Sequence, residues 1–174
     1  MSSQSLALSL FVHITATAIW IGGLLITMLL VWPAVQRTVK KEPTLYRLLS
    51  QLRKRFYPIS NLALVALIAT GLFQMTASSQ YDGFLNFDNT WSKVMLVKHI
   101  VIGLMAIAGL ILQYAVTPEL ERTSLLLELG KGSEGTDSKW QVLRRRETIL
   151  TWVNGLLGLS VLAFSAWLSA LSKL

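Results

Sequence analysis

The chain has 174 residues, of which 53% are hydrophobic and 14% are charged. This composition is too apolar for a soluble domain of this size, and the absence of cysteine excludes disulfides, thiolate metal sites and cysteine-ligated iron–sulfur clusters. A net charge of +7 would suit a nucleic-acid-binding protein, but the distribution of the charges argues for orientation in a membrane and against nucleic acid.

Four apolar runs are long enough to cross a bilayer as helices, which takes about 20 residues each. In chain order they cover residues 6–32, 59–77, 94–116 and 149–171. The connections between them are short and polar, so no segment remains for a separate soluble domain. The sequence therefore predicts an all-α fold, an up-and-down bundle of four transmembrane helices in which residues 1–174 form a single membrane domain.

The basic residues are concentrated in two of the three connections. Residues 33–58 and 117–148 together hold 13 of the 16 lysines and arginines. The positive-inside rule makes these connections cytoplasmic, which places both termini outside. For a bacterial protein this predicts a multi-pass protein of the inner membrane with periplasmic termini and the lipid bilayer as its first partner.

The connections also have patterns of their own. Residues 44–56 have leucines at helical spacing and predict a helix lying on the cytoplasmic leaflet. Residues 118–129 are expected to extend the third span, and the glycines of residues 130–138 predict a turn. The outer connection carries aromatic residues that predict a belt at the outer interface, namely Tyr81, Phe84, Phe87 and Trp91.

The chain has two histidines, and both fall inside apolar runs. His13 lies about 10 Å and His99 about 8 Å below the outer ends of spans that run in the same direction. An ionisable residue inside a membrane is a candidate functional residue, and two at one depth predict a shared centre. Trp20 follows His13 on its helical face, and Gly103 follows His99. At a similar depth the second span offers Gly71, a small residue that leaves space for a flat cofactor.

Several centres are compatible with this pair. Zinc normally takes three or four ligands and is disfavoured, because this depth holds no carboxylate. Two axial imidazoles are the usual ligands of haem b, so the sequence favours a bis-histidine haem that transfers electrons near the periplasmic face. Copper(I) accepts His and Met, and Met75 and Met95 would complete a copper site. Lys98 adjoins His99 in the same apolar run and is expected to snorkel or to pair with an anion such as a propionate.

The segment FVHITATAIWIGGLLITMLLVWP at residues 11–33 resembles the first helix of the copper-resistance D (CopD) domain. The similarity continues through RFYPISNLALVALIATGLFQM at residues 55–75, through residues 91–122 with Lys98 and a Pro-Glu-Leu-Glu-Arg, and through the basic lead-in at residues 144–168. This resemblance implies a four-helix membrane protein with a role in copper handling or in a haem-associated redox function. A member of this size is also expected to suit an accessory subunit of a respiratory or photosynthetic complex, or a partner of a periplasmic redox or copper protein.

A looser similarity links the chain to the HemJ family, membrane proteins implicated in protoporphyrinogen oxidation. Its functional histidine and lysine would correspond to His13 and Lys98, and Trp152-Val153-Asn154 is similar to a Trp-Phe-Asn of its last helix. The chain departs from that family at Gly22-Gly23 and at His99. Four hypotheses follow: a haem b electron-transfer protein, a copper transport or resistance protein, a HemJ-like oxidase and a cofactor-free accessory subunit.

Overall fold

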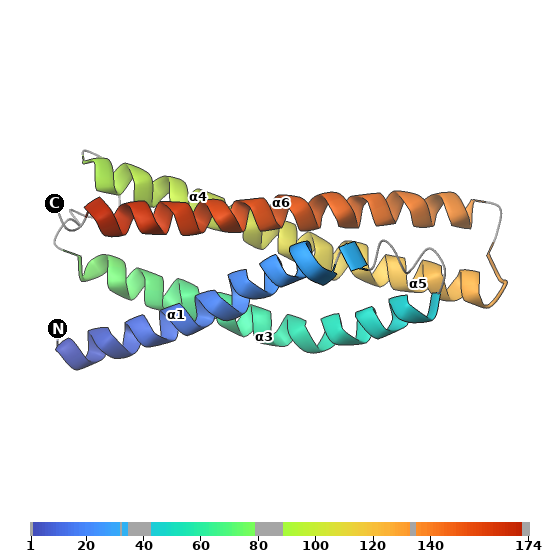
Figure 1. Cartoon of the computed structure of the whole chain (residues 1–174), viewed down its shortest axis with the longest axis horizontal. Helices are drawn as coiled ribbons and strands as arrows, with labels where there is room; N and C mark the ends of the chain where they lie inside the picture. Colours follow the sequence, from blue (N-terminus) through green and yellow to red (C-terminus); the bar gives the residue numbers. More distant parts are fainter. Residues whose placement is uncertain (1, 32, 35–42, 79–88, 133–134, 172–174) are drawn as a thin grey trace.

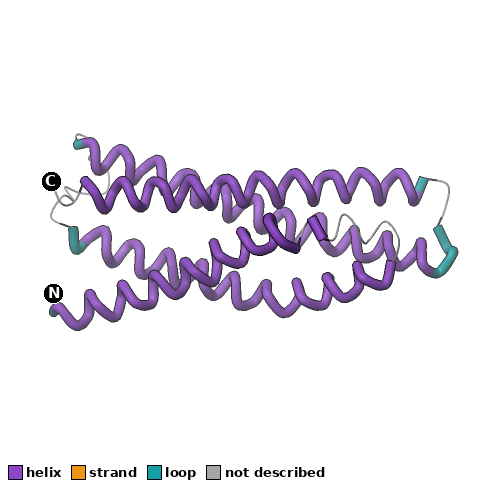
Figure 2. Tube along the Cα trace, in the orientation of Figure 1, coloured by secondary structure: helices purple, strands orange, loops and turns teal. Residues whose placement is uncertain are grey.

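The computed structural model describes residues 2–31, 33–34, 43–78, 89–132 and 135–171 (Figures 1 and 2). Within these ranges the named elements are all helices. In chain order they are α1 (Ser3–Ile26), the π-helix η1 (Thr27–Val31), α3 (Pro43–Thr76), α4 (Thr90–Ile111), the π-helix η2 (Leu112–Val116), α5 (Thr117–Glu128) and α6 (Thr136–Leu171).

Four rods built from these elements are long and apolar enough to cross a membrane, which confirms the four predicted spans. They are Ser3–Val31, Ser50–Thr76, Thr90–Glu128 and Thr136–Leu171. The start of α1 and the end of α6 lie at the same end of the bundle, which we call the terminal end (Figure 1). The opposite end, where α3 begins and α5 ends, is called the basic end.

Local chemistry explains several helix boundaries. The Ser2 side chain caps α1 by accepting a hydrogen bond from the backbone N–H of Ser5, and Asn89 caps α4 in the same way through Ser92. Past the end of α5, Gly130 has a φ of 63°, a left-handed conformation that favours glycine. Residues 129–130 form a turn at the start of the predicted turn over 130–138, but α6 begins at Thr136, so residues 136–138 are helical.

The helices are longer than the predicted spans. The third span does continue into α5, as expected. Residues 44–56 are helical as predicted, but they form the first part of α3, which runs unbroken from Pro43 to Thr76 with Pro58 inside it. A proline signals a helix end in most soluble proteins, but a transmembrane helix tolerates one because the freed carbonyl can be satisfied locally.

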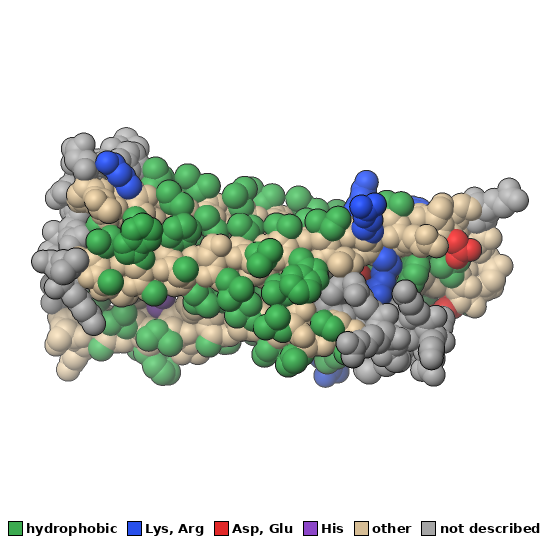
Figure 3. All heavy atoms as spheres, turned by 45° about the horizontal axis from the view of Figure 1, so that its top comes forward, with side chains coloured by type: hydrophobic (Ala, Val, Ile, Leu, Met, Phe, Trp, Pro, Cys, Tyr) green, Lys and Arg blue, Asp and Glu red, His purple; other side chains and the backbone are tan. Residues whose placement is uncertain are grey.

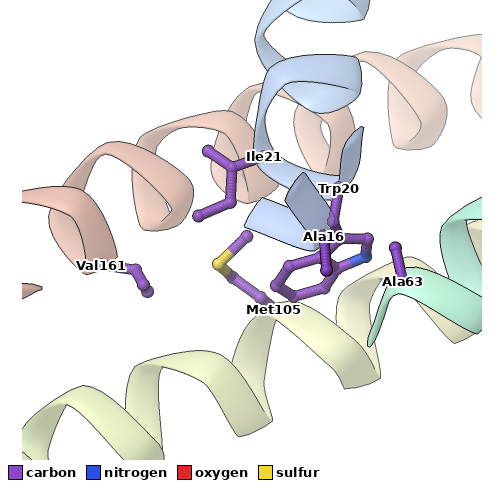
Figure 4. Packing of buried hydrophobic residues seen from close by; sticks show 6 residues of the cluster. All are labelled: Ala16, Trp20, Ile21, Ala63, Met105 and Val161. Carbon is purple, nitrogen blue, oxygen red and sulfur yellow. The ribbon is translucent and has the colours of Figure 1, made fainter. Parts of the chain in front are cut away.

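The bundle is held by a core shared among all the rods. α1 packs on α3 and α6, α4 packs on α6, and α5 contacts α3 and α6. One central cluster joins residues from four helices, with the Met105 side chain fully buried at its middle (Figure 4). Its members are Ala16, Trp20, Ile21, Ala63, Met105 and Val161. In Figure 3, hydrophobic side chains cover the visible face from the terminal end to beyond the middle of the bundle, as a lipid-facing surface requires, and charged side chains appear toward the basic end.

A buried ion cluster ties α3 to α6 toward the basic end. The Glu147 carboxylate is completely buried, and both the Arg53 and the Arg144 guanidinium groups donate to it. Because an unpaired buried carboxylate would be very costly, these two arginines are what allow Glu147 to lie inside the bundle.

Of the four aromatic residues predicted to form a belt in the outer connection, only Trp91 lies among the described residues. Tyr81, Phe84 and Phe87 lie outside the described residues. Trp91 is buried at 5% exposure and packs with Met75, so its indole does not face the lipid as a belt residue would. Apolar residues of α3, α4 and α6 cover the indole, and burying this large aromatic surface stabilises the contact among the three helices.

Candidate metal-binding site

His13 on α1 is half-buried and faces α3. Its Nδ1 lies 2.8 Å from the Oγ1 atom of Thr70. The Thr70 hydroxyl lies 2.6 Å from the carbonyl oxygen of Ala66, which can only accept a hydrogen bond. Since a hydroxyl has one proton to donate, Thr70 gives it to Ala66 and accepts from the Nδ1–H of His13. The Nε2 atom of the neutral imidazole therefore keeps its lone pair, which is the form that ligates metals.

A second polar bridge lies one helical turn closer to the terminal end. The Nε2 of Gln74 donates to the carbonyl oxygen of Ser9 at 3.2 Å and lies 3.3 Å from its Oγ. Ser9 is four residues before His13, and Gln74 is four residues after Thr70. The two bridges therefore stack along the contact between α1 and α3 and fix the rotation of His13 toward the interior. The sequence analysis did not predict these two bridges, although the second span places Thr70 at the estimated depth of His13.

Lys98 approaches the same site from α4. Its side chain is partly buried and acts electrostatically on His13. The four apolar runs of the sequence contain no acidic residue. Lys98 is therefore a charge that acts on His13 and has no acidic counter-charge within the four apolar runs.

His99 points the other way. It is exposed, and its Nδ1–H donates to the carbonyl oxygen of Met95 at 2.7 Å within its own helix. Adjacent helix residues differ by about 100° in direction, so Lys98 facing inward turns His99 outward. Gly103, one turn further on, is also exposed, and a Cβ there would meet nothing within 4 Å. The prediction that His13 and His99 face one centre is wrong, because matched depth does not fix rotation; the residues present do not fit a bis-histidine haem b.

The two methionines of the copper hypothesis lie together. Met75 is buried in a cluster with Trp91 at the terminal end, and Met95 packs against that cluster. Met75 is four residues beyond Gly71, where a Cβ would lie 3.5 Å from Cε1 of His13. The methionine pair is therefore about one helical turn, some 5 Å, from His13 along the bundle.

Two further predicted residues have modest roles at this site. Gly71 lies against the His13 ring, but the 3.5 Å separation is ordinary van der Waals contact, so close approach does not demand glycine there. Trp20 lies two turns beyond His13 and is buried at 6% exposure in the central cluster. It packs the core and does not line the polar region around His13.

A family model described as copper resistance protein D matches residues 50–168, which is more than half of the chain. The chain belongs to the copper resistance protein D (CopD) family. The family match includes Thr70, Met75, Met95 and Lys98, while His13 lies before its first residue. No curated protein and no solved structure matches the chain.

The ligand types available set the chemistry of this CopD-family bundle. Among the residues that the structure describes, no group of three or more His, Cys, Asp and Glu is placed to hold a metal ion. A hard divalent cation would need several such oxygen and nitrogen donors. The donors near the terminal end are one imidazole and two thioethers, which are ligands for a soft monovalent ion.

Proposed function

We propose that this membrane protein handles copper as Cu(I), which it binds near the terminal end with His13, Met75 and Met95. The observation that carries the proposal is the hydrogen bond from His13 to Thr70. It leaves the Nε2 lone pair available, about one helical turn along the bundle from the cluster that holds Met75 and Met95. Cu(I) is the ion that prefers this mixture of imidazole and thioether.

The electrostatics of the site favour a single positive charge. Lys98 acts on His13 from α4, and Coulomb repulsion from one ammonium doubles when the bound ion carries two charges instead of one. Cu(I) therefore suffers less repulsion at His13 than Cu(II) or Zn(II) would. It also tolerates the low coordination number that three residues provide.

We also propose an orientation and a partner class. The positive-inside rule directs the basic end toward the cytoplasm, so the terminal end and its copper ligands face the periplasm of a bacterial inner membrane. A periplasmic copper or redox protein is the class of partner that would meet this end. An assembly with a larger membrane complex is compatible with the exposed apolar faces of the rods.

Copper binding by the purified protein tests the proposal. The protein in detergent is titrated anaerobically against a chromogenic Cu(I) chelator. We expect His13→Ala and the pair Met75→Leu/Met95→Leu each to weaken the site at the terminal end by about tenfold or more. His99→Ala is the matched control, because His99 faces outward, and it should leave the affinity unchanged. An equal loss in His99→Ala and His13→Ala would contradict the assignment.

A second candidate function has one specific observation in its favour, the electrostatic influence of Lys98 on His13. An ammonium next to an imidazole suits a ligand that carries carboxylates, such as a tetrapyrrole, and this candidate takes up the HemJ resemblance. The visible spectrum of the protein tests it, with complementation of a strain that lacks protoporphyrinogen oxidase. A Soret band lost in His13→Ala and Lys98→Ala supports it, and a colourless protein without complementation removes it.

A further inference from the structure

A second group of soft and polar side chains begins at Met105 in the central cluster and extends toward the basic end. Met28 and Met105 are 3% and 0% exposed. The Sδ of Met28 occupies the place that a Cβ on Gly155 would take, and the Cε of Met105 lies 3.4 Å from a Cβ on Gly158. Because Gly155 and Gly158 are about 4.5 Å apart along α6, the two thioethers lie at neighbouring levels.

An unpartnered amide oxygen lies at the same level. Asn154 is 2% exposed, and its Oδ1 has no hydrogen-bond partner among the described residues. Its Nδ2 lies 3.6 Å from a Cβ on Gly109, which is one turn beyond Met105 on α4. The amide therefore sits between α4 and α6, next to the glycine that Met28 contacts.

The Thr151 hydroxyl, one turn closer to the basic end, is also buried without a partner in the part of the chain that the structure describes. Buried polar atoms in native proteins are nearly always satisfied by protein, water or a bound ion, so these two oxygens are available to a ligand. Ordinary core packing accounts for Met28 and Met105, but it does not account for the two oxygens of Thr151 and Asn154.

The backbone at Met28 is unusual as well. Met28 lies in the π-helix η1, which interrupts the α-helical hydrogen bonding at the basic end of α1. Such π segments inside helices occur frequently at functional sites, where they redirect side chains. Beyond Thr151, the buried face of α6 continues to Glu147, so polarity increases from the thioethers toward the basic end.

We propose that Met28, Met105 and Asn154 form a second Cu(I) site, so that copper moves along the bundle between two sites instead of being held at one end. The inference rests on the proposed function and extends it to conduction. Conduction needs binding at more than one depth, weak enough at each depth for the ion to leave. All four methionines after Met1 then serve copper, two at the terminal end and two in this inner site.

Binding stoichiometry separates the two sites. The purified protein in detergent is titrated with Cu(I) against a chelator, alongside Met28→Leu/Met105→Leu and Met75→Leu/Met95→Leu. Leucine conserves the volume of methionine, so both pairs keep the packing, which a thermal melt checks. We expect two copper ions in the wild type and one in each pair. The Asn154→Ala variant should weaken only the inner copper, by about tenfold or more.

Transport completes the test. In proteoliposomes, the Met28→Leu/Met105→Leu pair should lower Cu(I) flux by about tenfold or more while the copper at the terminal end stays bound. Two coppers retained in that pair, a wild type with one copper that only Met75→Leu/Met95→Leu removes, or an unchanged inner affinity in Asn154→Ala would each overturn the inner site and leave the proposed function standing. A wild type that binds no copper would overturn both.

Discussion

Two histidines of one chain differ in what surrounds them, and this difference decides what each imidazole can bind. Both rings donate from Nδ1 to an oxygen, and both keep a lone pair on Nε2. His13 is held against Thr70 between two helices, whereas His99 is exposed and donates its hydrogen bond to a carbonyl oxygen of its own helix. Only His13 can therefore combine with ligands from other helices of the same chain.

The Thr70 hydroxyl should control the copper affinity of His13. In Thr70→Val the acceptor for Nδ1–H is lost at nearly constant volume, so the ring is free to rotate and to change tautomer. We expect Cu(I) binding at the terminal end to weaken by about 10–100-fold, measured by chelator competition. Thr15→Val is the control, because Thr15 is exposed and its hydroxyl donates only to its own helix at Phe11. Equal effects in both variants would remove the role of Thr70.

Glu147 should contribute far more to stability than a carboxylate on the surface. In Glu147→Gln the fully buried carboxylate that accepts from the largely buried Arg53 and Arg144 loses its charge, and we expect a loss of about 3–5 kcal/mol in the free energy of unfolding. Glu121→Gln breaks an exposed pair with Lys54, whose side chain is 63% exposed, and should cost less than about 1 kcal/mol. Unfolding of both variants in mixed detergent micelles measures the difference, and equal costs would contradict the buried cluster.

At the scale of the helices, adjacent glycines of α1 test how tightly α1 and α3 pack. A Cβ on Gly23 would overlap the ring of Phe56, whereas a Cβ on Gly22 would meet nothing within 4 Å. We expect Gly23→Ala to destabilise the bundle by about 1–3 kcal/mol because the ring must move. Gly22→Ala should leave the stability unchanged or slightly raised, because alanine favours the helix. Unfolding in mixed detergent micelles measures both free energies of unfolding, and a destabilising Gly22→Ala would contradict this packing of α1 against α3.

The helices also show where sequence reasoning succeeds and where it stops. Apolar length alone predicted all four spans, because a bilayer imposes it on every crossing helix. The rotation of α4 was not predictable, because every face of a membrane helix is apolar and no amphipathic stripe marks its interior. His99 was therefore assigned to the shared centre as a ligand although it faces outward, whereas its neighbour Lys98 is the partly buried residue that acts on His13. The contact between Thr70 and His13 was not predicted, since nothing local in the sequence reveals a hydrogen bond across 57 positions.

On the scale of the whole molecule, charge and ligands are segregated along one axis. The buried arginine and glutamate residues lie toward the basic end, while the imidazole and two thioethers lie toward the terminal end. The inner site of Met28, Met105 and Asn154 falls between them. In the proposed function, a soft monovalent ion finds ligands at two depths along this axis. Beyond the inner site, the axis ends at the charged cluster of Arg53, Arg144 and Glu147. The direction of the axis in the membrane therefore decides from which side copper first meets the protein.

The orientation of the bundle can be measured directly, because the chain has no cysteine to interfere with labelling. Ser2→Cys lies at the exposed start of α1, and Lys131→Cys lies at the exposed turn after α5, at the opposite end. The positive-inside rule predicts that a membrane-impermeant maleimide labels Ser2→Cys in intact bacterial cells with a permeable outer membrane, and labels Lys131→Cys only after the inner membrane is opened. The reverse pattern would place the copper ligands on the cytoplasmic side and would make the proposed site a point of copper release instead of entry.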